Sequence, residues 1–100
     1  MSASLPVPVV HNPDAHRFEA VVDGRLSKAN YRLEDGTLWM VHTEVPREQE
    51  GRGIAAALVH AAFEHAQAHG LKVAPVCSYV RAYMRRHPKT RALLADGYPL

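Results

Sequence analysis

The chain has 100 residues, of which 47% are hydrophobic, and its twelve Lys and Arg exceed its ten Asp and Glu to give a formal net charge of +2. This length leaves room for one modest core, and a single cysteine excludes an internal disulfide, so a reducing, cytoplasmic location is expected. No apolar run is long enough to span a membrane, and the start, MSASLPVPVV, lacks the basic, leucine-rich character of a secretion signal.

Three β-type stretches dominate the first half of the chain. The first two end at Asp-Gly pairs, which favour tight hairpin turns, and the third is stopped by Pro46. Parallel pairing would need longer crossovers. We therefore predict a loose, proline-spaced tail at 1–10, followed by an antiparallel meander. Its strands are expected at 16–22, 25–33 and 37–45.

The periodicity becomes helical from 53 to 69, and Gly70 suits the left-handed residue that follows a helix. The apolar stretch 71–77 predicts a strand parallel to the one at 37–45, because a helix connects the two. Two further helices are expected at 78–87 and 89–97. The order β-β-β-α-β-α-α predicts one α+β domain over 11–100, with helices covering a mixed, mostly antiparallel sheet.

Charge is divided unequally along the chain. Residues 1–50 contain five Lys/Arg and eight Asp/Glu, a net charge of −3, whereas residues 51–100 contain seven and two, a net charge of +5. An anionic ligand on the second half would explain the difference, and so would an ordinary solvated surface.

The stretch EVPREQEGRGIAAAL, residues 44–58, places a charged, glycine-containing turn directly before a helix. A helix start leaves about four backbone N–H groups unpaired and carries roughly half a positive charge, so it can bind a phosphate. Gly51 and Gly53 would let the backbone approach the anion without a Cβ in the way. Arg52 would add a charge-assisted contact. Glycines before a helix also serve as plain turn residues.

Two motifs resemble those of the GNAT N-acetyltransferase superfamily. The strand end at Val45-Pro46, the charged spacer and GRGIA at 51–55 resemble its acetyl-coenzyme A motif. CSYVRAYMRRHP resembles its second motif, in which a tyrosine on a helix faces the cofactor sulfur. With HTEVP and LKVAPVC, these motifs resemble a short GNAT-like subfamily close to this chain in length, over about 11–94.

The resemblance implies acetyl-coenzyme A as the cofactor and a small-molecule or protein amine as its partner, hence an N-acetyltransferase. Coenzyme A would lie where the third and fourth strands splay apart. The backbone of Thr43, Glu44 and Val45 would pair with the pantetheine arm. The pyrophosphate would be held by the backbone of Gly51, Arg52, Gly53, Ile54 and Ala55.

The chain departs from the family pattern in two ways. Glu50 stands where Arg or Gln is usual, and its carboxylate would repel the pyrophosphate unless Arg52 offset it. No helices precede the strand at 16–22, whereas full-length members carry two between their first strands, and those helices form one wall of the acceptor site. A homodimer would supply that wall, and a non-catalytic module that binds or senses acyl-coenzyme A is the alternative function.

Three residues are candidates for the chemistry, and each also has a structural explanation. Tyr83 matches the motif tyrosine that would protonate the leaving thiolate, or it is a core tyrosine. Cys77 begins a helix and would be a nucleophile or line the thioester pocket, or it is a small buried side chain. His42 suits a general base, with Glu44 orienting it, or it is a surface histidine. By strand alternation, His42 is expected on the same face as Met40 and Glu44.

The helix at 78–87 carries several cations. Tyr79 and Arg86 are assigned to the cofactor, with arginine charge for the 3′-phosphate of coenzyme A; a solvated face is the alternative. Nucleic acid is disfavoured as a partner because no reading motif accompanies these cations. A metal is not expected, since His65 and His69 have ligand spacing without a carboxylate or cysteine placed to complete a site.

Overall fold

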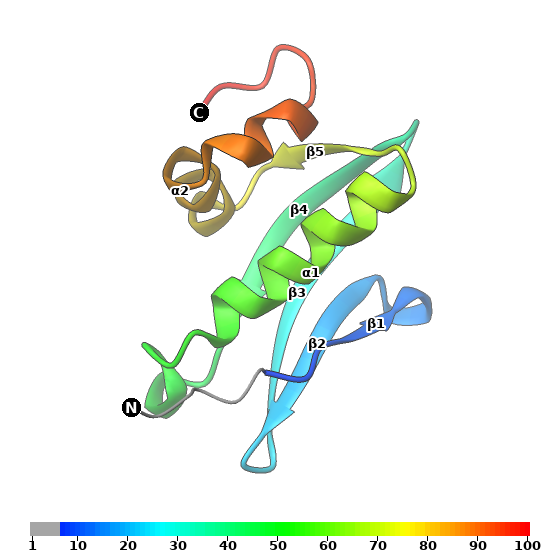
Figure 1. The fold of residues 1–100 in the computed structure, drawn as a ribbon. Helices are drawn as coiled ribbons and strands as arrows, with labels where there is room; N and C mark the ends of the chain where they lie inside the picture. Colours follow the sequence, from blue (N-terminus) through cyan, green and yellow to red (C-terminus); the bar gives the residue numbers. More distant parts are fainter. Residues whose placement is uncertain (1–6) are drawn as a thin grey trace.

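The computed structural model describes residues 7–100 as a five-stranded sheet with one long helix across one face and a second helix beside it (Figure 1). The strands are β1 (Val10–Asn12), β2 (Arg17–Val22), β3 (Arg25–Glu34), β4 (Thr37–Glu44) and β5 (Lys72–Pro75). The helices are α1 (Ile54–Ala68) and α2 (Ser78–Arg86), and short 3-10 helices occur at η1 (Pro13–Ala15), η2 (Arg47–Gln49) and η3 (Pro88–Leu93).

The sheet confirms the predicted α+β class. Its strands lie in chain order, every neighbouring pair is antiparallel except β4 and β5, and that last pair is parallel as expected. Both hairpins turn on Asp-Gly pairs in which the two residues have positive φ, as at Asp23 (51°) and Gly24 (75°). This is the turn geometry that fits the right-handed twist of paired strands.

Two elements differ from the expected order. β1 is an additional edge strand, so Val10 at the end of the predicted tail is already paired with Glu19 of β2, while residues 1–6 of that tail lie outside the described residues. The predicted helix at 89–97 is instead the short η3, because Leu94 bridges to Val73 and the chain joins the edge of the sheet.

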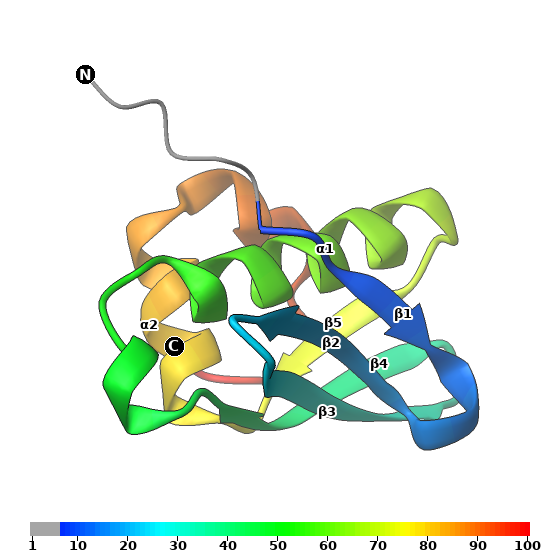
Figure 2. The same ribbon diagram turned by 90° about the horizontal axis from the view of Figure 1, so that it is seen from below.

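The core lies between α1 and the sheet, and Figure 2 shows the helix lying across one face of the strands. One side of α1 is buried, and small residues such as Ala62 and Ala66, both 0% exposed, let the helix approach the strands closely. Phe18, Tyr31 and Met40 meet it from the sheet. Each fully buried large side chain contributes roughly 1.5–3 kcal/mol. We call the sheet face that meets α1 the inner face.

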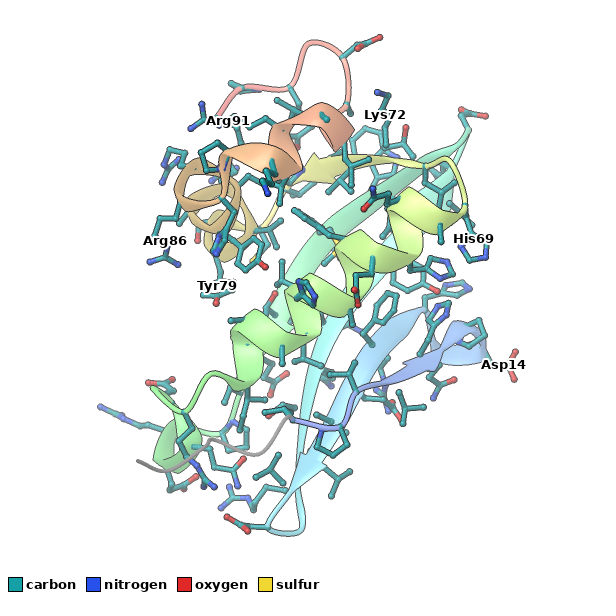
Figure 3. All side chains as sticks on the ribbon, viewed as in Figure 1. Asp14, His69, Lys72, Tyr79, Arg86 and Arg91 are labelled. Atoms are coloured by element: carbon teal, nitrogen blue, oxygen red, sulfur yellow. The ribbon has the colours of Figure 1, made fainter. Side chains whose placement is uncertain are left out.

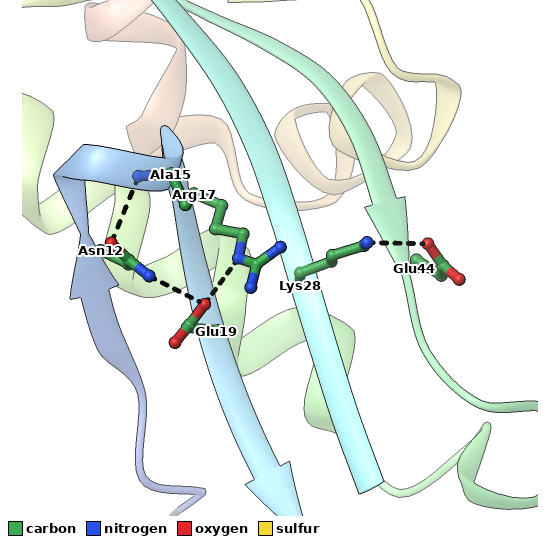
Figure 4. A network of polar contacts seen from close by, with 6 residues as sticks. All are labelled: Asn12, Ala15, Arg17, Glu19, Lys28 and Glu44. Carbon is green, nitrogen blue, oxygen red and sulfur yellow. Dashed lines mark hydrogen bonds and ion pairs between the residues drawn. The ribbon is translucent and has the colours of Figure 1, made fainter.

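The outer face of the sheet, which points away from α1, carries polar pairs (Figure 4). Arg17 Nε lies 2.6 Å from Glu19 Oε2, and Lys28 Nζ lies 3.7 Å from Glu44 Oε1. These pairs are partly accessible to solvent and contribute little stability each. They identify the solvated side of β2, β3 and β4.

A β-bulge in β4 inverts its side-chain alternation. Asn30 of β3 pairs with His42 and Tyr31 pairs with Met40, so Val41 is one extra residue on β4. Met40 is fully buried on the inner face, whereas the side chain of His42 is 61% exposed on the outer face. The expectation that His42 shares a face with Met40 is therefore wrong, because a bulge shifts the phase of every later residue.

β4 and β5 separate after Met40 and Pro75, the last residues that they pair. The backbone N–H of Cys77 donates to the Met40 carbonyl at 2.9 Å, and the chain then turns into α2. Arg81 holds this end of β5 by donating from Nη1 to the Val76 carbonyl at 3.1 Å. β4 continues beyond this fork without a β5 partner.

A histidine cluster joins β1 to α1. The His11 ring stacks on Phe18 at 4.4 Å and meets His65 edge-on at 4.5 Å, and His65 stacks on His69 at 4.1 Å. His11 Nε2 and the Tyr31 hydroxyl are hydrogen-bonded at 2.6 Å. Burial is the main cause that lowers the pKa of His11 and of His65, and the neighbouring imidazoles lower both further.

Candidate active site

A pocket of about 410 Å³ opens where the end of β4, the loop around η2, the start of α1 and the side of α2 meet. Its position along β4 lies beyond the fork, where the strand has no β5 partner. It is lined by Thr43, Val45, Gln49, Glu50, Gly51, Gly53, Ile54, Ala55, Ala56 and Tyr79.

The start of α1 presents unpaired backbone donors to this pocket. The first intrahelical hydrogen bond runs from the Ala57 N–H to the Gly53 carbonyl at 3.0 Å, and no side chain caps the helix. The preceding N–H groups, at Ile54, Ala55 and Ala56, therefore lack intrahelical partners. These donors and the positive end of the helix suit an anion.

Gly51 and Gly53 shape the backbone beside those donors. Both have a φ of +84°, a left-handed conformation that disfavours other residues. A Cβ at either position would meet no protein atom within 4 Å. The glycines therefore allow the left-handed backbone conformation of the turn. They also leave open the space that a ligand close to the backbone would need.

Seven of the ten predicted cofactor residues line the pocket: Thr43, Val45, Gly51, Gly53, Ile54, Ala55 and Tyr79. The other three, Glu44, Arg52 and Arg86, are not among the lining residues. The Glu44 and Arg52 side chains point to other partners, with Arg52 Nη1 3.1 Å from Asp23 Oδ2, but the backbone of each lies between two lining residues. Arg86 lies on α2 outside the lining.

Gln49 and Ala56 also line the pocket, although the sequence analysis did not predict them as site residues. Gln49 is only 4% exposed, and its Nε2 donates to the Val22 carbonyl at 2.7 Å. This bond holds the loop against the β2–β3 hairpin. The two residues are 27 positions apart, so no local pattern indicates the contact. The sequence does contain a signal for Ala56, because its backbone N–H follows that of Ala55 in the first turn of the helix and is also unpaired.

Tyr79 is the tyrosine that faces the pocket. Figure 3 shows it on α2 together with Arg86. Burial is the main cause that raises the Tyr79 pKa, while the Arg86 charge opposes the shift. Tyr83 lies one turn later, only 6% exposed, edge-on to Phe63 at 5.6 Å and stacked on His87 at 4.0 Å. Burial also raises the Tyr83 pKa, so both phenols keep their proton at neutral pH.

Cys77 and His42 lie on different sides of the fork. Cys77 Sγ is 3.7 Å from the Thr43 hydroxyl, which places the thiol next to a residue of the pocket wall. His42 Nε2 is 3.7 Å from Glu44 Oε1 on the outer face. Cys77 is thus adjacent to the pocket, and His42 can meet only a molecule that approaches from the opposite side of the sheet.

Several arginines of α2 and η3 bind backbone carbonyls. Besides the bond from Arg81, Arg85 Nη1 of α2 donates to the Leu100 carbonyl, and Arg91 Nη2 of η3 donates to the Arg85 carbonyl. These bonds tie α2 to the C-terminal segment.

Across residues 7–100 there is no helix long and apolar enough to cross a bilayer, and no group of three or more His, Cys, Asp or Glu side chains arranged for a metal ion.

Comparison with known proteins identifies the family. Residues 17–93 match the family described as GCN5-related N-acetyl-transferase. The chain is 31% identical to Protein NATD1 of Xenopus tropicalis over 91 residues, covering 88% of this chain and 84% of that protein, and 30% identical to Protein NATD1 of Homo sapiens, covering 88% and 80%. The fold also matches the solution structure of a GCN5-like protein from Staphylococcus aureus, with a TM-score of 0.71, 22% identity, and 90% and 89% of the two chains covered.

Proposed function

The chain belongs to the GCN5-related N-acetyltransferase family, and on that premise we propose that it transfers an acetyl group from acetyl-coenzyme A to a small-molecule or protein amine. The observation that carries the proposal is the pocket in which the unpaired N–H groups of α1 meet the free edge of β4. Two parts of the cofactor could form hydrogen bonds there. Backbone N–H groups at a helix start can bind a diphosphate, and an unpaired strand edge can bind the amides of pantetheine.

The backbone from Gly53 to Ala56 would hold the pyrophosphate. The backbone of Thr43 at the edge of β4, and of Val45 just beyond the strand, would pair with the pantetheine arm. Cys77 Sγ, 3.7 Å from the Thr43 hydroxyl, would then border that arm. Arg86 is the α2 cation proposed for the 3′-phosphate, because it lies near Tyr79 of the pocket wall and, within residues 7–100, forms no ion pair.

When bound, acetyl-coenzyme A supplies the acetyl group as an activated thioester. Tyr79 is the proposed acid that gives its proton to the departing thiolate, because it lines the pocket and burial keeps it protonated. Tyr83, buried one turn behind it, is the alternative acid. His42 is the proposed base for an amine that arrives at the outer face, and Cys77 borders the thioester end of the pocket, where a nucleophilic role is the alternative to lining it.

Calorimetric titration with coenzyme A tests the cofactor site. Gly53→Ala adds a methyl group where the diphosphate would lie and should weaken binding at least tenfold. Gly70→Ala is the matched control, because Gly70 also has a positive φ, 67°, with open space around it, but lies at the other end of α1. Equal binding by the two variants would show that the diphosphate is not held at Gly53.

A non-catalytic coenzyme A-binding module is the second candidate. A specific observation favours it: β1 and β2 are joined only by the short η1, so within residues 7–100 no α-helix precedes β2 to form a wall of an acceptor site. Release of the free thiol in the presence of an amine panel separates the two functions. Cofactor binding without thiol release across that panel would favour the module.

A further inference from the structure

The segment directly before α1 has few bonds that fix its own shape. Within residues 7–100, the backbone of Gly51 and Arg52 forms no backbone–backbone hydrogen bond, whereas the Gly53 carbonyl is held by the Ala57 N–H of α1 at 3.0 Å. Gly51 and Gly53 both have a φ of +84°, and glycine gives the chain unusual conformational freedom. The shape of the segment therefore depends on what fixes its other end.

Gln49 fixes that end against the sheet. Its side-chain Nε2 donates to the Val22 carbonyl at 2.7 Å, two residues before Gly51. Val22 ends β2, pairs with Arg25 across the hairpin turn and packs against the core. Figure 1 shows this hairpin and the loop before α1 at the same end of the sheet. The Val22 carbonyl is thus a fixed point of the fold to which the loop is tied.

Two ion pairs join the same loop to the same hairpin, but both are exposed. Arg25 Nη1 lies 3.2 Å from Glu48 Oε1, and these side chains are 52% and 65% exposed. Arg52 Nη1 lies 3.1 Å from Asp23 Oδ2, with exposures of 49% and 70%. Exposed pairs of this kind hold a geometry weakly, because solvent screens them. The bond from Gln49, which is only 4% exposed, is the buried contact of the three.

The other half of the Gln49 amide shows that stability alone does not explain this residue. Its Oε1 is buried and, within residues 7–100, has no hydrogen-bond partner. A buried acceptor that stays unpaired costs free energy, which an apolar side chain of similar size would avoid. What the amide provides instead is direction, since one donor aimed at one carbonyl sets the path of the chain.

We propose that Gln49 is the positioning residue of the diphosphate site. Its bond to the Val22 carbonyl sets residues 50–53 in the conformation that directs the N–H groups at the start of α1 toward one anion. The proposal rests on the proposed function. A loop that already has its bound conformation loses less conformational freedom when the ligand arrives, so affinity rises. Gln49 acts through the loop, and its effect is confined to ligands that carry the diphosphate.

NMR relaxation of the backbone N–H groups in the ligand-free protein tests the positioning directly. Gln49→Met removes the bond and keeps a similar volume. The order parameters of Gly51 and Gly53 should fall from about 0.85 to below about 0.6, and that of Gly70 at the other end of α1 should not change. Gln49→Asn, one methylene too short to reach the carbonyl, should give the same result if Gln49→Met unfolds. Unchanged order at both glycines overturns the proposal, whether or not the protein binds coenzyme A.

Two ligands then separate positioning from general damage. Gln49→Met should weaken coenzyme A binding about fivefold, the net effect of one hydrogen bond, and leave the affinity for pantetheine, which lacks the diphosphate, unchanged. Glu48→Gln is the matched control, because it removes an exposed contact from the same loop, and it should change neither affinity more than about twofold. Calorimetry measures the first ligand and amide shift titration the second.

The outcomes distinguish this proposal from the proposed function. Equal losses for coenzyme A and pantetheine, or no loss for coenzyme A in a folded Gln49→Met variant, refute the positioning role and leave the cofactor site standing. Failure of the wild-type protein to bind coenzyme A refutes the proposed function, and the relaxation measurement still decides whether Gln49 orders the loop.

Discussion

Replacing Glu50 by glutamine should tighten coenzyme A binding, because Glu50 places a negative charge in the wall of the pocket proposed for a diphosphate. Arg52 does not neutralise it, since that guanidinium pairs with Asp23 at 3.1 Å. In a water-like dielectric, a charge about 8 Å from each of two phosphate charges repels them by about 1 kcal/mol in total. This energy corresponds to about a fivefold change in Kd.

Salt gives the prediction a second, independent signature. Glu50 is exposed, so the gain should be near fivefold at low salt and fall to about twofold at physiological ionic strength, where the Debye length is about 8 Å. Calorimetric titration with coenzyme A at both salt concentrations measures it.

The control removes the same charge from the same loop. Glu48→Gln should change Kd little, because Glu48 pairs with Arg25 at 3.2 Å and lies outside the pocket lining. Equal gains for the Glu50 and Glu48 variants, or a gain that salt does not reduce, would refute the reasoning that a local carboxylate opposes the diphosphate.

Three further predictions address the cofactor, the acid and the fold. Arg86→Ala should weaken coenzyme A binding by several-fold to about tenfold and leave dephospho-coenzyme A unaffected; equal losses for both ligands would remove Arg86 from the 3′-phosphate. Tyr79→Phe should lower kcat by about a hundredfold or more, and Tyr83→Phe by much less; the reverse order would make Tyr83 the acid. Thermal unfolding should show stability falling as pH drops below about 6.5, because His11 and His65 have lowered pKa values when folded and the unfolded chain binds protons first. His65→Leu should flatten that fall, and an unchanged pH profile would show that the cluster is not responsible.

Local patterns in the sequence were sufficient for most of the fold. The Asp-Gly pairs defined both hairpins, and helical periodicity defined α1 within one or two residues at each end. Gly70, with a φ of 67°, ends that helix as expected. The glycines before α1 also indicated the pocket, because an uncapped helix start is a property of a few consecutive residues.

Tertiary structure alone decided which side chains share the site. The bulge at Val41 moved His42 to the outer face, and no sequence signal marks it, because the extra residue is defined only by pairing with β3. Arg52 forms an ion pair with Asp23, 29 positions away, and Tyr79 rather than Tyr83 lines the pocket. Periodicity reports the hydrogen bonds and burial of neighbouring residues, whereas strand register and side-chain partners depend on contacts between segments that meet only when the whole chain packs.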